Sequence, residues 1–303
     1  MKKHNLLAII GLVLLIMAAC SKNIQFDKFS ENSRHQEAEM TISNYEYEIT
    51  TSSAFEDLNQ ELLLLNQIYP SEVPNRGRFW NWFKRIVLGD VLGACTGTAI
   101  TFSPIGAIVF GILGSINGYL YEYHQEYGPT SYPSEPTVSP NMNIASMQSA
   151  INAGYVHNMV IYEIFDTYGD EIYEMSDAVL CDKIISHCRQ YIPVPINIET
   201  SLRTNTTSKV LLNNAMRDYG IISSEVILNG FSHTYPSISD ELETLSIFCD
   251  HYTGLLNQDT RDSYTTSFIS TVNASAIPIA SKDFLIASIS TANYSTKLWI
   301  DNQ

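Results

Sequence analysis

Apolar residues recur at helical spacing through most of this chain. A first helix is predicted between residue 50 and Pro70, and its apolar positions follow one another at intervals of three and four: Phe55, Leu58, Leu62, Leu65 and Ile68. Later stretches with the same periodicity predict helices over residues 176–190, 206–219, 239–256, 260–273 and 281–300. For residues 221–231 the pattern is compatible with either a helix or a short strand. The pattern therefore predicts a mainly α protein, a bundle of helices.

A second pattern covers residues 86–121, where the chain is almost free of charge and Asp90 is the exception. Ser103 and Pro104 divide this stretch into two arms, and glycines punctuate both of them: Gly89, Gly93, Gly97, Gly106, Gly111, Gly114 and Gly118. A glycine inside a helix costs about 1 kcal/mol relative to alanine, so a row of them indicates a gain from close packing. GxxxG faces let two helix backbones approach closely. The stretch predicts a glycine-rich helical hairpin.

The location of this hairpin has two interpretations. Each arm, with about 17 residues, is about 26 Å long, slightly less than the roughly 30 Å of a hydrocarbon core. The residues just before the first arm are typical of a membrane interface: Trp80, Trp82, Lys84 and Arg85. Asp90 and Asn117 favour a wetter environment. The hairpin is thus either the buried centre of a helical domain or an element that inserts into a bilayer.

The amino terminus has the features of an export signal. Lys2 and Lys3 precede an apolar stretch that ends in Ala18 and Ala19, directly before Cys20. This arrangement resembles the signal of bacterial lipoproteins, in which cleavage makes the cysteine the first residue and acyl chains attach to it. The apolar stretch is shorter than the roughly 20 residues of a membrane span. The resemblance implies an exported protein of the bacterial cell envelope, with the outer membrane expected, anchored in the lipid bilayer through acylated Cys20.

These patterns divide the chain into five parts. Residues 20–50 contain few bulky apolar side chains and many polar ones, and residues 128–142 are rich in proline, serine and threonine. The predicted organisation is a cleaved signal peptide over 1–19, a flexible tether over 20–50, a helix plus the hairpin over 51–127, a Pro-rich spacer over 128–142 and an α-helical domain over 143–303.

Charge and cysteine usage narrow the possible partners. The full chain has a formal net charge of −15, and removal of residues 1–19 leaves 15 Lys and Arg against 32 Asp and Glu, a charge of −17. An acidic protein lacks the positive footprint that nucleic acid requires. Four cysteines remain after Cys20, either as buried thiols or with one disulfide among them: Cys95, Cys181, Cys188 and Cys249. Their spacing does not match a zinc site.

His157 and Asn158 are candidates for a ligand contact, because an imidazole beside a carboxamide can hold a ligand or move a proton. The sequence favours the other interpretation, a histidine that is hydrogen-bonded within the core. An acidic series in the same region is typical of a solvated helix face: Glu163, Asp166, Asp170, Glu174 and Asp177. No motif of a known catalytic, phosphate-binding or metal site occurs. We therefore expect no enzymatic activity, metal or cofactor.

The combination of a lipoprotein signal, an aromatic cluster, a glycine-rich hairpin and a GxxHN helix resembles uncharacterised exported lipoproteins of Bacteroidota. The residues that carry this resemblance are Trp80, Trp82, Gly89, Asp90, Gly93, Gly97, Gly106, Gly111, Gly114, Gly154, His157 and Asn158. The resemblance implies a layout but no chemistry. Two hypotheses follow: a surface or envelope lipoprotein that binds a protein or a small molecule through its helices, or a bacteriocin-like or toxin-like effector that inserts residues 86–121 into a membrane.

Overall fold

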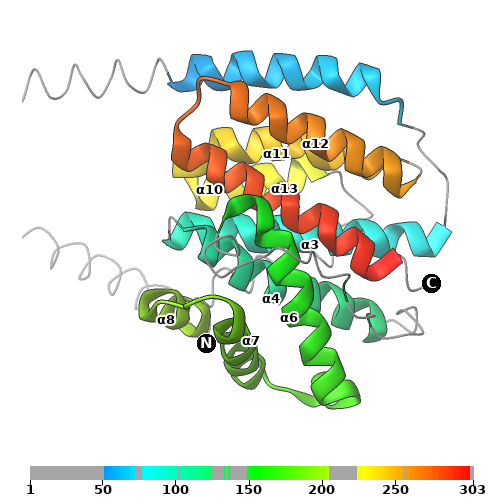
Figure 1. The fold of residues 1–303 in the computed structure, drawn as a ribbon, viewed down its shortest axis with the longest axis vertical. Coiled ribbons are helices and arrows are strands. Elements are labelled where there is room, and N and C mark those ends of the chain that lie inside the picture. Colours follow the sequence, from blue (N-terminus) through cyan, green and yellow to red (C-terminus); the bar gives the residue numbers. More distant parts are fainter. Residues whose placement is uncertain are drawn as a thin grey trace, which may run out of the picture. The chain divides into compact units, whose positions relative to one another are not determined.

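Helices make up every regular element in the described part of the chain, which is known from a computed structural model. The structure describes residues 51–71, 77–101, 103–124, 133, 136, 149–204, 224–255 and 257–300. The helices are residues 51–68, α3 (Gly77–Thr101), α4 (Pro104–His124), α6 (Ala153–Tyr168), α7 (Asp177–Tyr191), α8 (Ile196–Thr204), α10 (Ser224–Thr234), α11 (Ser239–Tyr252), α12 (Gln258–Ala274) and α13 (Ile279–Ile300) (Figure 1). Three short 3₁₀ helices connect them: η1 (Ala150–Asn152), η2 (Gly169–Glu174) and η3 (Pro236–Ile238). The mainly α bundle is confirmed.

The predicted hairpin is formed by α3 and α4. Pro104 is the first residue of α4, where its missing N–H is not needed, and the Ser103 hydroxyl accepts a hydrogen bond from the Ile105 amide at 3.2 Å. The two helices then pack backbone against backbone. A Cβ atom on Gly93 would overlap the carbonyl oxygen of Phe110, and one on Gly114 would overlap that of Gly89. Glycine at these positions is therefore required by the approach of the two helices.

Other helices enclose the hairpin. Side chains are buried throughout residues 86–98 and throughout 106–119 except at Asn117. Helix α13 packs on both arms and on α6, and Figure 1 shows it crossing α3 beside α6. Gly154 allows α6 to approach α13, because a Cβ atom there would overlap the carbonyl oxygen of Ser290. The most apolar segment of the described chain thus lies at the centre of its core.

An outer group of helices completes the core on one side. The helix of residues 51–68 buries Phe55, Leu58 and Leu62, but Leu65 is only partly buried and Ile68 is 71% exposed. The predicted apolar face therefore continues one turn beyond the part that is covered. Helices α11 and α12 lie alongside it, and the Tyr264 hydroxyl of α12 donates to Asn66 Oδ1 at 2.8 Å.

Most helices predicted from periodicity are present, with small shifts at their ends. Ser176 is the N-cap of α7, and α11 ends at Tyr252, four residues before the predicted end. The sequence did not decide between helix and strand for residues 221–231. Their described part, residues 224–231, is helical and belongs to α10. The predicted helix over residues 206–219 lies outside the described residues. Gly169, with a φ of 50°, ends α6 and interrupts the acidic series after Asp166.

The described residues all belong to one compact unit, residues 50–303. The predicted signal peptide, Cys20 and the predicted tether of residues 20–50 lie outside the described residues, as does the predicted Pro-rich spacer apart from residues 133 and 136. In the described chain, no helix combines the length and the apolar character needed to cross a membrane.

Candidate functional site

A cluster of polar side chains lies where the hairpin meets α6 and α13. Asp90 comes from α3, and the neighbours His157 and Asn158 come from α6. Asp90 and His157 have no exposed surface, and Asn158 is 2% exposed. Gly111 of α4 faces the same cluster, and a Cβ atom there would stand 3.6 Å from His157 Cδ2, an ordinary contact distance. The cluster therefore lies where α3, α4 and α6 meet.

Hydrogen bonds fix the orientation of Asn158 and His157. The Asn158 Nδ2 donates to the main-chain carbonyl of Tyr294 in α13 at 2.6 Å. Its Oδ1 consequently faces His157 Nδ1, 3.0 Å away. Because Oδ1 can only accept, Nδ1 carries a proton and donates it. The other imidazole nitrogen, Nε2, lies 3.2 Å from Asp90 Oδ1.

Asp90 lies beside His157 in a site without solvent, which affects its protonation. Burial raises the pKa of Asp90 above its ordinary value, while the nearby His157 imidazole and the Ser295 and Ser115 hydroxyls act in the opposite direction. A protonated Asp90 beside a neutral imidazole and an ionised Asp90 beside an imidazolium both have no net charge. Any other protonation state leaves an uncompensated charge in the core, which is costly.

The face of α13 toward the hairpin carries further polar groups. Its Trp299 donates from Nε1 to Ser115 Oγ of α4 at 3.3 Å, and Ser290 Oγ donates to the Ile151 carbonyl at 2.7 Å. The Gly154 amide donates to the same Ser290 Oγ at 3.2 Å. In the part of the chain that the structure describes, the buried hydroxyls of Thr96 and Thr291 have no hydrogen-bond partner. The hairpin is thus held to α6 and α13 by specific polar contacts as well as by apolar packing.

The cluster couples helices and is closed to solvent. His157 and Asn158 direct their polar atoms at Asp90 and at the backbone of α13, so contact with a solute would require these helices to separate. The arrangement therefore couples the position of α3 to that of α6. It offers no exposed nucleophile or base.

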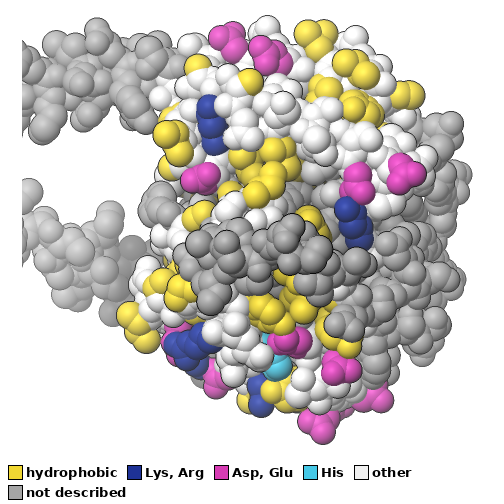
Figure 2. All heavy atoms as spheres, in the orientation of Figure 1, with side chains coloured by type: hydrophobic (Ala, Val, Ile, Leu, Met, Phe, Trp, Pro, Cys, Tyr) yellow, Lys and Arg dark blue, Asp and Glu magenta, His cyan; other side chains and the backbone are white. Residues whose placement is uncertain are grey.

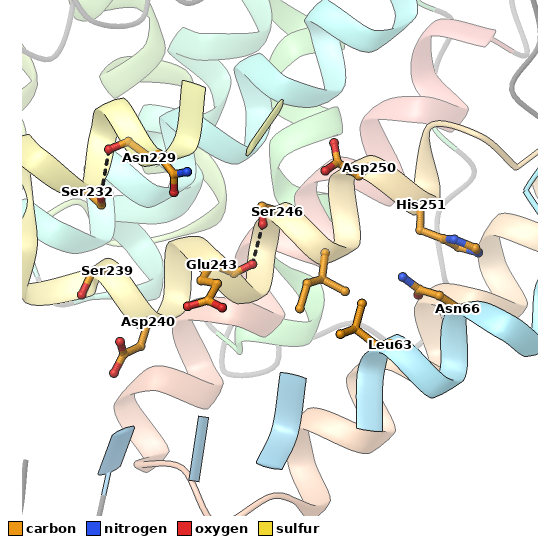
Figure 3. A pocket seen from close by; sticks show the side chains of 11 residues that line it. Leu63, Asn66, Asn229, Ser232, Ser239, Asp240, Glu243, Ser246, Asp250 and His251 are labelled. Carbon is orange, nitrogen blue, oxygen red and sulfur yellow. Dashed lines mark hydrogen bonds between the residues drawn. The ribbon is translucent and has the colours of Figure 1, made fainter. Parts of the chain in front are cut away.

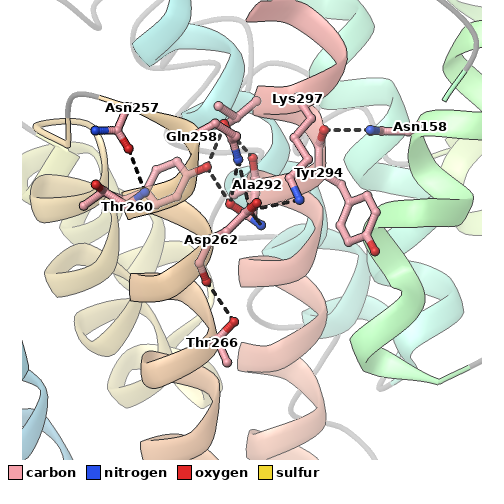
Figure 4. Close-up of polar contacts among 12 residues, drawn as sticks. Asn158, Asn257, Gln258, Thr260, Asp262, Thr266, Ala292, Tyr294 and Lys297 are labelled. Atoms are coloured by element: carbon pink, nitrogen blue, oxygen red, sulfur yellow. Dashed lines mark hydrogen bonds and ion pairs between the residues drawn. The ribbon is translucent and has the colours of Figure 1, made fainter. Parts of the chain in front are cut away.

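A second polar network joins α11, α12 and α13 (Figure 4). Asp262 of α12 forms an ion pair with Lys297 at 2.9 Å and accepts from Asn293 Nδ2 at 2.8 Å. The buried Tyr252 hydroxyl of α11 contacts Asn293 Oδ1 and Thr296 Oγ1, each at 2.9 Å. These contacts fix the register of α13 against the outer helices.

The remaining predicted residues lie apart from the cluster or outside the described side chains. Trp80 and Trp82 belong to α3, but their side chains are outside the described part; Lys84 and Arg85 are partly buried. Gly118 is a buried residue of α4. The four cysteines after Cys20 are buried free thiols, and burial raises the pKa of Cys95, Cys188 and Cys249. No set of side chains suited to holding a metal ion occurs in the described residues.

Sequence reasoning singled out His157, Asn158 and Asp90 separately and missed that they meet. The signal was present in part, since Asp90 is the one charge in an apolar stretch and therefore needs a buried partner. Helical periodicity gives no distance between residues 67 positions apart. Ser115 and Ser295 carried no signal, because isolated serines are common in helices.

The comparisons with known proteins add no relative: no protein-family model, curated protein or solved structure matches this chain.

Proposed function

We propose that this chain is a lipid-anchored lipoprotein of the bacterial cell envelope whose helical body binds a partner, with the α3–α4 hairpin as its internal scaffold. The observation that carries the proposal is the enclosure of the hairpin. Gly93, Gly97 and Gly114 face the contact between α3 and α4, and the outer faces of the hairpin are covered by α6 and α13. The surface that remains for a partner belongs to the outer helices.

The polar contacts of the hairpin support the role of a scaffold. A membrane-inserting hairpin gains nothing from a buried aspartate, whereas a scaffold gains specificity when that aspartate has one partner in the fold. Asp90 has such a partner in His157, which Asn158 orients in turn. These contacts favour one packing of the hairpin over other registers.

The anchor follows from the sequence. Acyl chains on Cys20 would attach the protein to a bilayer without a spanning helix, because each buried methylene contributes about 0.8 kcal/mol. Residues 20–50 would then separate the body from the membrane surface. The chain is acidic, and Figure 2 shows Asp and Glu side chains distributed over the visible face, with hydrophobic ones in several separate groups between them. A protein or small-molecule partner fits such a surface, and nucleic acid does not.

Fractionation of cells that express the native chain tests the anchor. We expect the protein in the membrane fraction, with mass spectrometry showing an acylated chain that begins at Cys20. A Cys20→Ser variant should lose the acyl chains and leave the membrane fraction, while its circular dichroism stays unchanged because the body begins only at residue 50. An unmodified full-length native chain in the cytosol would refute the proposal.

One observation favours the membrane-active effector as a second candidate. Helices α3 and α4 contact each other backbone to backbone, and α4 carries no charged residue from Pro104 to Tyr121. The two helices could therefore leave the bundle together. Dye release from liposomes by the purified mature protein tests this candidate. Release at micromolar protein supports insertion, and intact vesicles count against it.

A further inference from the structure

A groove runs along the outer face of α11, far from the buried cluster. It has a volume of about 820 Å³ and lies between α11, α10 and the helix of residues 51–68 (Figure 3). Helix α11 contributes residues at intervals of three, four and three, which place them on one helix face. These are Asp240, Glu243, Ile247 and Asp250. The groove is thus lined along its length by a single stripe of α11.

Carboxylates dominate the charge of this groove. Asp240 and Glu243 stand toward one end and Asp250 toward the other (Figure 3), and no Lys or Arg is among the described residues that line the groove. His251 adds no positive charge at neutral pH, because burial lowers its pKa, an effect only partly opposed by its hydrogen bond to the Tyr69 carbonyl. Acids in a concave surface focus a negative potential and attract cations.

Apolar side chains occupy the middle of the groove. Ile247 is partly buried between the acidic ends, and Leu63 faces α11 from the opposite helix with 53% of its surface exposed. The distance from Asp240 to Asp250 along α11 is about 15 Å, from the helical rise of ten residues. A ligand for this groove therefore needs an apolar stripe with positive charges toward both ends.

We propose that this groove binds a cationic amphipathic helix of a partner protein. Such a helix would lie along α11, place its apolar stripe on Leu63 and Ile247, and direct lysines or arginines at Glu243, Asp240 and Asp250. Complementary charge argues for this occupant, since the groove is acidic and the chain as a whole has a net charge of −15. The inference rests on the proposed binding function and names its partner class.

Fluorescence anisotropy with the mature chain tests this inference. The probe is a labelled synthetic helix of about 15 residues, about 22 Å long, with a leucine stripe flanked by lysines. A second probe carries glutamates in place of the lysines. We expect binding of the lysine probe that weakens with added salt, and no binding of the glutamate probe.

Matched variants locate the binding. Glu243→Lys should raise the Kd of the lysine probe about tenfold, which is about 1.4 kcal/mol. Glu171→Lys is the control, because Glu171 is also exposed but lies in η2 near the lower end of α6, away from α11. This control should leave the Kd nearly unchanged. Leu63→Ser should raise the Kd about fivefold, since half of the leucine surface is available to a ligand.

Several results would overturn the inference. They are an absence of binding by the lysine probe, equal weakening by Glu171→Lys, and competition by spermine as strong as by the unlabelled peptide, which would identify a site for small cations. Self-association that Glu243→Lys abolishes would assign the groove to a second copy and also contradict it. These results are independent of the fractionation test. A failure of the groove as a binding site can therefore be distinguished from a failure of the proposed lipid anchor.

Discussion

At the scale of single residues, the buried contact between Asp90 and His157 is the feature with the clearest consequences. Asn158 orients the imidazole through Nδ1, and Nε2 then faces Asp90 Oδ1 at 3.2 Å. From the sequence, the need of Asp90 for a partner could be predicted. The identity of that partner could not, since it depends on how α3 and α6 cross.

The pH dependence of stability follows from the raised pKa of Asp90. Above about pH 4 an unfolded aspartate is ionised, whereas the folded Asp90 still holds a proton up to its raised pKa. The contribution of Asp90 to stability is therefore complete below about pH 4 and falls by up to about 1.4 kcal/mol per pH unit as the pH rises toward the folded pKa.

Asp90→Asn should remove this dependence. An asparagine side chain does not titrate, so its contribution to stability stays constant where that of Asp90 falls with rising pH. Urea unfolding at several pH values measures the two curves. Parallel curves for the two proteins would show that the folded Asp90 does not have a raised pKa.

At the scale of elements, the glycines of the hairpin have two different roles. Gly114 is required by contact, since a Cβ atom would overlap the Gly89 carbonyl, whereas Gly230 of α10 has no atom within 4 Å of its added Cβ. The spacing of glycines predicted the hairpin, because GxxxG faces have one structural use in paired helices. Spacing did not predict that Gly111 and Gly154 serve contacts outside the hairpin, with α6 and α13.

Gly114→Ala and Gly230→Ala form a matched pair for this distinction. Both gain about 1 kcal/mol of helix propensity, but only Gly114→Ala pays an overpacking cost of about 1–3 kcal/mol. The free energy of unfolding should therefore be lower in Gly114→Ala than in Gly230→Ala by about that cost. Chemical denaturation measures both, and equal stabilities would mean that α3 and α4 are not in backbone contact.

Periodicity predicted most helices but not which apolar residues they cover. Ile68 continues the pattern of Leu58 and Leu62 and is nevertheless 71% exposed, because the neighbouring helices do not extend over it. The helix predicted over residues 239–256 also extends four residues beyond the observed end of α11 at Tyr252. Ends and coverage depend on tertiary contacts, which a one-dimensional pattern does not contain.

At the scale of the whole described body, the enclosed hairpin connects the fold to the function. Sequence left open whether residues 86–121 form a core or insert into a bilayer, because length and hydropathy suit both. The structure shows α13 and α6 on its outer faces, joined to it through Asp90 and Trp299. The proposed binding function then belongs to the outer surface, where the groove of α11 lies.

Hydrogen exchange of the mature protein, with and without lipid vesicles, tests the enclosure of the hairpin most directly. A scaffold predicts that amides of α3, α4 and α13 belong to one slowly exchanging class that opens only with global unfolding, and that vesicles leave their rates unchanged. Faster exchange of α13 in the presence of vesicles, while α3 and α4 stay protected, would mean that the hairpin leaves the bundle for the membrane and would contradict the scaffold.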